Sequence, residues 1–132
     1  MESPKLRRNI TKLKDGGAPS GPYSLAVVSD GAVYVSGQIP VDPSNGKMPE
    51  GTEEQIRQAM KNLVSVLSAA DIDTRNLLKV TVYLTDMKDF DLMNSIYAEM
   101  FGPAYPARTC VGVSSLPKGA KIMIDAICEK HV

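Results

Sequence analysis

A chain of 132 residues with 43% hydrophobic and 23% charged residues has the size and composition of one ordinary globular domain. Its 15 basic residues are balanced by 15 acidic ones, which argues against a protein that binds nucleic acid through excess positive charge. No apolar run approaches the roughly 18–20 residues that cross a membrane. We therefore expect a single domain over residues 1–132, with an ordered core over about residues 10–128.

The N-terminal residues carry a small basic cluster, Lys5, Arg7 and Arg8, without the apolar stretch of a secretory signal. We interpret this cluster as a short solvated leader, with an organellar address as the alternative. The two cysteines, Cys110 and Cys128, do not indicate a disulfide scaffold in a chain of this length. These features favour a cytoplasmic protein with reduced thiols.

Two β-like runs, residues 24–28 and 32–36, begin the patterned part of the chain. The pair Asp30-Gly31 between them is typical of a tight β-hairpin. A further short strand is expected near Ile10, before an irregular loop over residues 15–22 that is rich in glycine and proline. A second turn-rich segment, residues 42–46, separates the hairpin from the first helix.

The first helix has the strongest pattern in the sequence. Thr52 and Gln55 form a capping-box pattern, in which each side chain bonds the backbone of the other residue at the helix N-terminus. Apolar residues then recur on one face of the expected helix, at Ile56, Ala59, Met60, Leu63, Val64 and Leu67. Asp71 and Asp73 end the helix.

A strand, a helix and two further strands complete the predicted domain. Residues 77–85 are rich in β-branched side chains, and residues from about 88 to 101 show the one-sided apolar spacing of a second helix. Two final strands are expected at about residues 107–114 and 120–128. This order predicts an α+β fold in which two helices pack on one face of a sheet of about six strands.

The opposite face of that sheet is not fully polar. Thr81 and Tyr83 point to this face from one strand, and in the last strand Met123 and Ile127 flank Asp125 there. A sheet face in contact with water is normally polar. We therefore expect another subunit to cover this face.

Arg108 lies at the start of a predicted strand, in the segment Tyr-Pro-Ala-Arg-Thr-Cys over residues 105–110. Side chains alternate along a strand, so Arg108 and Cys110 point to the same face. An arginine on a face that is otherwise buried needs a carboxylate or phosphate partner. That partner is either an acidic side chain in a structural ion pair or the carboxylate of a bound ligand.

Other kinds of site have little support in the sequence. A cysteine nucleophile at Cys110 needs a neighbouring base, and the only histidine is the penultimate residue, His131. No cluster of His, Cys and acidic residues has the spacing of a metal site, and no glycine loop is placed to bind phosphate. We therefore expect no metal and interpret Cys110 as a small buried residue.

Four segments, in order along the chain, resemble the RidA family (reactive intermediate deaminase A), whose members are also named L-PSP endoribonucleases or translation inhibitors. The segments are APSGPYS at residues 18–24, VSGQIP at 35–40, PARTCV at 106–111 and LPKGA at 116–120. Each motif is short, but the four together place the resemblance over nearly the whole chain, from about Ile10 to Cys128.

The resemblance implies a chorismate-mutase-like α+β fold with a six-stranded mixed sheet, assembled as a homotrimer with clefts between adjacent subunits. It implies hydrolytic deamination of reactive enamines and imines, such as 2-iminopropanoate and 2-iminobutanoate, to 2-oxo acids and ammonia without a cofactor. The arginine that matches Arg108 is implied to be catalytic and to clamp the substrate carboxylate. The positions implied to bind substrate or line the cleft match Tyr23, Ser36, Gly37, Asn94 and Cys110.

One position departs from the family pattern. The last strand of the family usually carries a glutamate that positions or activates the attacking water, and the matching residue here is Met123. A thioether cannot accept a proton or order water as a carboxylate does. Asp125 matches a second acidic position, but it lies two residues, or roughly 6–7 Å, further along the strand and is not a simple replacement.

The expected function is thus the binding of small 2-oxo or 2-imino carboxylates at Arg108, with imine deamination as the activity. Two alternatives stay open: a non-catalytic protein that binds carboxylate metabolites, and the RNA cleavage behind the older family name. The balanced charge and the lack of a histidine pair for acid–base catalysis disfavour RNA cleavage.

Overall fold

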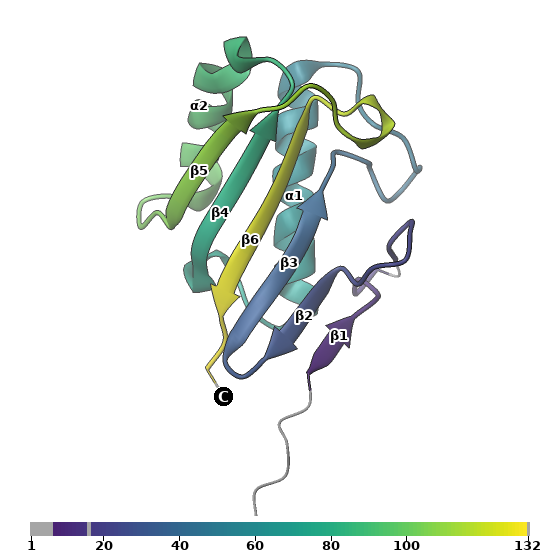
Figure 1. The fold of residues 1–132 in the computed structure, drawn as a ribbon, viewed down its shortest axis with the longest axis vertical. Coiled ribbons are helices and arrows are strands. Elements are labelled where there is room, and N and C mark those ends of the chain that lie inside the picture. The colour runs from purple at the N-terminus through teal and green to yellow at the C-terminus, as the bar shows by residue number, and fades with distance from the viewer. Residues whose placement is uncertain (1–6, 16, 132) are drawn as a thin grey trace, which may run out of the picture.

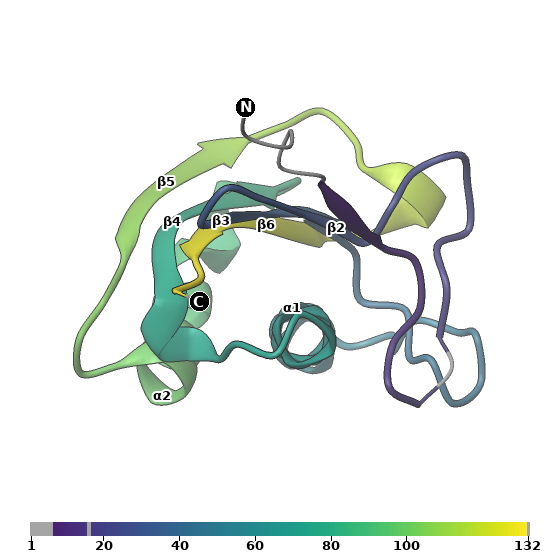
Figure 2. The ribbon, with the colours of Figure 1, turned by 90° about the horizontal axis from the view of Figure 1, so that it is seen from below.

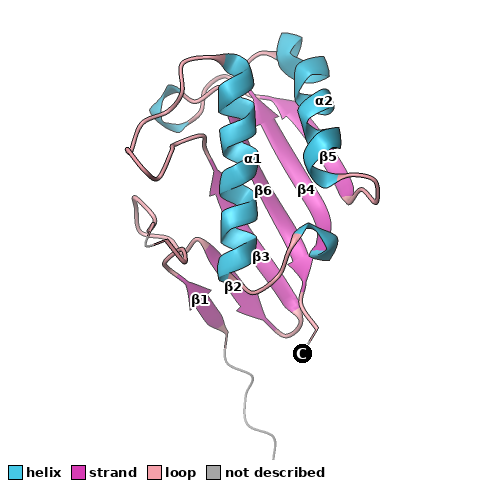
Figure 3. Cartoon of the chain, turned by 180° about the vertical axis from the view of Figure 1, so that it is seen from behind, coloured by secondary structure: helices cyan, strands magenta, loops and turns pink. Residues whose placement is uncertain are grey.

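The computed structural model describes residues 7–15 and 17–131, which form one sheet and two α-helices (Figure 1). The six strands are β1 (Arg8–Ile10), β2 (Ala26–Ser29), β3 (Ala32–Gln38), β4 (Leu77–Leu84), β5 (Ala107–Gly112) and β6 (Ile122–Glu129). The helices are α1 (Thr52–Ala69) and α2 (Phe90–Phe101). Figures 2 and 3 show both helices on the same face of the sheet, which confirms the predicted α+β architecture.

The strand order across the sheet is β1-β2-β3-β6-β4-β5. Neighbouring strands are antiparallel except β4 and β5, which run parallel with Val80 opposite Arg108 and Val82 opposite Cys110. Parallel neighbours need a long crossover connection, and the segment that contains α2 supplies it. The sheet is therefore mixed, and the strand that carries Arg108 lies at its edge.

The β2–β3 hairpin turns at Asp30 and Gly31, whose φ angles are 48° and 86°. Positive φ at both central residues is the mark of a type I′ turn, whose twist matches that of the strands it joins. The predicted hairpin is confirmed. Ala26 lies opposite Val35 in this hairpin. The VSGQIP motif, which begins at Val35, therefore lies at the end of β3 away from the turn.

A continuous apolar core lies between the helices and the sheet. On α1 the predicted face is buried except at Val64, which is partly buried, and Ile56, Met60 and Leu63 are at most 1% exposed. On β4 the side chains of Val80 and Val82 are fully buried against this layer. Because side chains alternate along a strand, the residues between them face away from the helices. The buried residues of each strand therefore show which site residues lie on the helix side of the sheet and which lie on the open side.

The capping-box prediction at the start of α1 is wrong. The N-cap is Gly51, and no side chain caps the helix. Gln55 instead donates from Nε2 to the Pro49 carbonyl at 2.8 Å and accepts from the Lys121 backbone N–H at 3.0 Å. Thr52 Oγ1 accepts from Lys121 Nζ at 3.0 Å. Since Gln55 is nearly buried, the nearby Pro49 carbonyl and the distant Lys121 backbone satisfy its amide in place of the helix terminus.

Other boundaries differ from the predictions by a few residues. Helix α2 begins at Phe90 because a 3-10 turn, Met87–Asp89, precedes it. Strand β5 ends at Gly112, two residues earlier than expected. Within the basic leader, Arg8 belongs to β1, and Lys5 lies outside the described residues.

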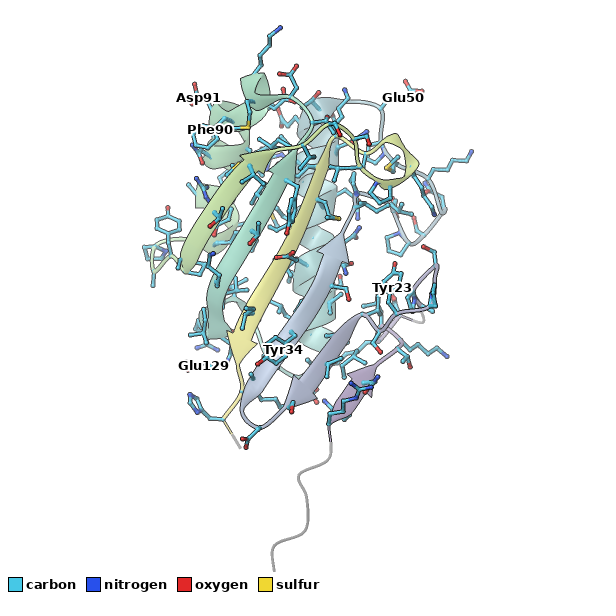
Figure 4. All side chains as sticks on the ribbon, in the orientation of Figure 1. Tyr23, Tyr34, Glu50, Phe90, Asp91 and Glu129 are labelled. Carbon is cyan, nitrogen blue, oxygen red and sulfur yellow. The ribbon has the colours of Figure 1, made fainter. Side chains whose placement is uncertain are left out.

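The face of the sheet that the helices leave open is partly apolar. Tyr34, Val111 and Ile127 are 50%, 38% and 41% exposed there, and Figure 4 shows Tyr34 in front of the sheet. Tyr83 donates its hydroxyl hydrogen bond to Asp125 Oδ2 at 2.9 Å on the same face. Tyr34 and Ile127 are opposite each other on β3 and β6, and exposed apolar groups side by side are typical of a surface that another protein covers. A covering subunit stays a prediction.

Candidate functional site

Arg108 lies in the edge strand β5, on the side of the sheet that faces the helices. Its neighbour in β4 is Val80, and Cys110 is opposite Val82 in the same way. Both valines are fully buried, so Arg108 and Cys110 share the helix side of the sheet, as the two-residue period predicts. Arg108 itself is only partly buried, because no strand lies beyond β5.

The guanidinium group of Arg108 is held by helix α2. Its Cζ atom lies 4.9 Å from the ring centroid of Tyr97 and 5.7 Å from that of Phe90, both within the range of cation–π attraction. Nη1 lies 3.8 Å from the sulfur of Met93. Among the described residues no acidic side chain forms an ion pair with Arg108. The first alternative, a structural ion pair between Arg108 and an acidic side chain, is therefore not formed among the described residues.

A pocket of about 320 Å³ opens beside Arg108. It is lined by Asn94, Tyr97, Ala98, Tyr105, Pro106 and Arg108. Two of its polar atoms, Asn94 Oδ1 and the Tyr97 hydroxyl, are buried without a hydrogen-bond partner among the described residues. Buried polar groups are normally paired, so this combination of a cation and unpaired polar atoms is suited to a small polar ligand.

Cys110 is a partly buried residue beside this pocket rather than an activated nucleophile. Burial raises the pKa of its thiol, and the charge of Arg108 opposes that shift less strongly. The thiol therefore stays protonated at neutral pH. His131 is exposed and lies 3.3 Å from Glu129, so it does not serve Cys110 as a base.

Tyr23 and Gly37 belong to a second pocket of about 340 Å³. A β-bulge between Val35 and Gln38 shifts the register of β3 against β6, and it contains Ser36 and Gly37. Bulges of this kind re-aim side chains and are common beside functional sites. The Ser36 hydroxyl donates to the carbonyl of Ser24 at 2.6 Å, which ties the bulge to the loop that carries Tyr23.

Met123, the position of the missing glutamate, lies against this bulge. A Cβ atom added to Gly37 would come within 2.6 Å of the Met123 sulfur, so a side chain at residue 37 would collide with it. Met123 is opposite Tyr83, and Asp125 is opposite Thr81, on the open face of the sheet. Met123 and Asp125 therefore share a face, as predicted, and this is the face opposite that of Arg108.

The predicted site residues thus form two separate groups in one chain. Arg108, Asn94 and Cys110 lie at the β5 edge, and the other group, Tyr23, Ser36 and Gly37, lies around the end of β3. Strands β6 and β4 separate them, a span of three strand spacings or roughly 14 Å. Figure 4 shows Tyr23 and Phe90, a neighbour of Arg108, toward opposite edges of the sheet.

Two aromatic residues that hold the Arg108 guanidinium, Tyr97 and Phe90, were not predicted as site residues. Both residues belong to the one-sided apolar spacing over residues from about 88 to 101, which predicted a helix and gave no reason to expect a ligand. A signal was present in the spacing, because Asn94 and Tyr97 are three residues apart and share a helix face. An asparagine on the apolar side of a helix needs a hydrogen-bond partner there, which indicates a binding site.

Among residues 7–15 and 17–131, no three His, Cys, Asp or Glu side chains gather where a metal ion could bind. In the same ranges no helix has the length and apolar composition to cross a membrane.

Sequence comparisons match this architecture to known proteins. The family described as Endoribonuclease L-PSP matches residues 15–130. A human 2-iminobutanoate/2-iminopropanoate deaminase is 45% identical over 123 residues, which cover 92% of this chain and 89% of the relative. A RutC family protein of Pyrococcus horikoshii is 46% identical over 114 residues, covering 86% and 90% of the two chains.

Solved structures share the fold over almost the whole chain. RidA from an Antarctic Psychrobacter has a TM-score of 0.88 at 33% identity and covers 93% of this chain and 100% of its own. E. coli TdcF with bound serine has a TM-score of 0.87 at 33% identity, with coverage of 94% and 100%. Fold and site together define a small α+β protein with an arginine-lined pocket at its sheet edge. The chain belongs to the RidA family, as its four motifs predict.

Proposed function

We propose that the protein hydrolyses small 2-imino acids, such as 2-iminopropanoate and 2-iminobutanoate, to 2-oxo acids and ammonia. The observation that carries this proposal is the guanidinium group of Arg108, which lines a pocket and has no acidic partner among the described residues. A ligand carboxylate would supply that partner through two parallel hydrogen bonds. The name of the human relative, a 2-iminobutanoate/2-iminopropanoate deaminase, supports the same substrate class.

The reaction requires water to attack the imine carbon. A carbon–oxygen bond forms while the electron pair of the C=N bond moves to nitrogen, and the water proton is transferred to nitrogen. The hydroxyl proton of this intermediate then moves to the amine nitrogen, and as the carbon–nitrogen bond breaks the oxygen electron pair forms the carbonyl group and ammonia leaves. In this proposal Arg108 holds the carboxylate, so the adjacent imine carbon is fixed in position and less entropy is lost in reaching the transition state.

A second copy of the chain completes the proposed site. The group around Tyr23 and Gly37 lies on other strands than Arg108, and Met123 faces the opposite side of the sheet. A four-carbon acid is too small to contact both groups in one chain. Packing of the open face against a neighbouring subunit brings the end of β3 in one copy toward the β5 edge of another, and three such contacts close a homotrimer.

The oligomeric state tests this arrangement. Sedimentation equilibrium at micromolar concentration is expected to give a mass of about three times the 14.2 kDa of one chain. Ile127→Glu should shift the protein toward monomers, because it places a charge on the apolar face that the neighbour covers. A wild-type protein that sediments as a 14.2 kDa monomer would remove the second half of the site.

The activity is tested with 2-iminobutanoate generated in the assay by a pyridoxal-phosphate-dependent dehydratase. Ammonia and 2-oxobutanoate are expected to appear faster than in the absence of the protein, but slowly for an enzyme. The reason is Met123, which leaves the attacking water without the carboxylate that the family usually places there. Arg108→Ala serves as the control and should return the rate to background.

A non-catalytic binder of carboxylate metabolites is the second candidate, and the thioether of Met123 against Gly37 is the observation that favours it. This candidate predicts binding of pyruvate or 2-oxobutanoate at Arg108 with no release of ammonia above background. The two measurements together therefore distinguish enzyme from binder.

A further inference from the structure

The Arg108 pocket contains a polar atom that the reaction above does not use, the hydroxyl of Tyr97. The Tyr97 side chain is only 4% exposed, and its hydroxyl has no hydrogen-bond partner among the described residues. Asn94, one turn earlier on α2, leaves its Oδ1 atom unpaired in the same pocket. Among the described residues, two buried polar atoms without hydrogen-bond partners thus lie beside a cation that has no acidic partner.

Packing alone explains the ring of Tyr97 but not its hydroxyl. The ring meets Phe101 edge-on at 4.7 Å between centroids, stacks with Tyr105 at 6.2 Å and supports the guanidinium of Arg108. Phenylalanine would make the same contacts without burying an oxygen that has no partner. A buried hydroxyl in that condition destabilises the unliganded fold, so its presence points to a partner that the described residues do not supply.

The hydroxyl is suited to donate to an anion held by Arg108. The guanidinium carbon lies 4.9 Å from the Tyr97 ring centroid, so a carboxylate on the guanidinium lies close to this ring. Burial raises the pKa of Tyr97, and the charge of Arg108 opposes this less strongly, so the phenol keeps its proton at neutral pH. A carboxylate accepts about four hydrogen bonds, of which the arginine fork uses two.

We propose that Tyr97 is a substrate-binding residue whose hydroxyl donates a hydrogen bond to the carboxylate held by Arg108. This inference rests on the function proposed above, since it concerns the same carboxylate. A third hydrogen bond fixes the plane of the carboxylate group, and with it the direction of the bond to the imine carbon. Tyr97 therefore favours acids whose carboxylate is free on both oxygens.

Tyr97→Phe tests the proposal because it removes one atom and keeps the ring. Isothermal titration calorimetry of the full chain with 2-oxobutanoate is expected to show a Kd raised roughly ten- to a hundredfold. The melting temperature of the unliganded variant should not fall, because the hydroxyl that is removed bonds no other group in the described part of the chain. Ser95→Ala, which removes an exposed hydroxyl from the same helix outside the Arg108 pocket, is the control and should bind as wild type.

Arg108→Ala, titrated alongside, separates this inference from the proposed function. If Arg108→Ala loses affinity while Tyr97→Phe keeps it, Tyr97 has no role in binding and the proposed function stands. If both variants bind like wild type, the carboxylate binds elsewhere and both proposals are overturned. A lower melting temperature of unliganded Tyr97→Phe together with weaker binding would assign the hydroxyl to the fold and would also overturn the inference.

Discussion

Replacing Arg108 with alanine is expected to weaken the binding of pyruvate or 2-oxobutanoate by roughly ten- to a hundredfold or more. The change removes a charge-assisted contact with two parallel hydrogen bonds, and no other cation is found among the described residues that line the pocket. The fold should remain, because the contacts of Arg108 are with Phe90, Met93 and Tyr97 rather than with a buried acid. Calorimetric titration measures the affinity, and circular dichroism with thermal denaturation checks the fold.

Arg108→Lys tests whether binding needs the planar guanidinium group or only a positive charge. Lysine keeps the positive charge but presents it as a point, so it cannot reproduce the planar fork or its stacking on Tyr97. Most of the affinity should therefore be lost in this variant as well. An Arg108→Ala protein that fails to fold would assign Arg108 to a structural role, and a variant that folds and binds normally would place the ligand elsewhere.

The second large effect is expected at Met123, where glutamate should increase the rate of deamination. A positioned acid or base typically contributes about 10²–10⁴-fold to a proton-transfer step, and wild type lacks it at this position. Glutamate is similar in length to methionine, so its carboxylate would lie against Gly37, where the sulfur lies now. Release of ammonia from 2-iminobutanoate, followed at saturating substrate, measures the gain.

Two controls separate a water-activating carboxylate from a change of shape. Met123→Gln has nearly the same size as Met123→Glu but cannot act as a base, so it should give no gain. Asp125→Asn tests the nearest acidic side chain on that face. Its remaining side-chain oxygen can still accept the hydrogen bond from Tyr83, so the variant should fold, and its rate should stay close to that of wild type.

The result that contradicts this account is a fast wild-type enzyme that loses activity on Met123→Glu. Another group, such as Tyr23 or a main-chain carbonyl, would then hold the water. If wild type and Met123→Glu both release no ammonia above background while 2-oxo acids still bind, the non-catalytic candidate is the better description.

The sequence by itself determined those features that depend on residues close together along the chain. The apolar spacing from Ile56 onward predicted α1, and Asp30-Gly31 predicted the turn, because both patterns are local consequences of helix period and backbone conformation. The alternation along a strand also placed Arg108 and Cys110 on one face. The motifs identified the family because they are read directly from the residues.

The tertiary structure alone decided what depends on residues far apart in the chain. Gln55 matched a local capping pattern, but its amide bonds Pro49 and the Lys121 backbone, since burial made those partners necessary. Whether Arg108 had an acidic partner depended on which helix packs against β5. The separation of Arg108 from Gly37 followed from strand order, which no local pattern specifies because strand pairing joins segments distant in sequence.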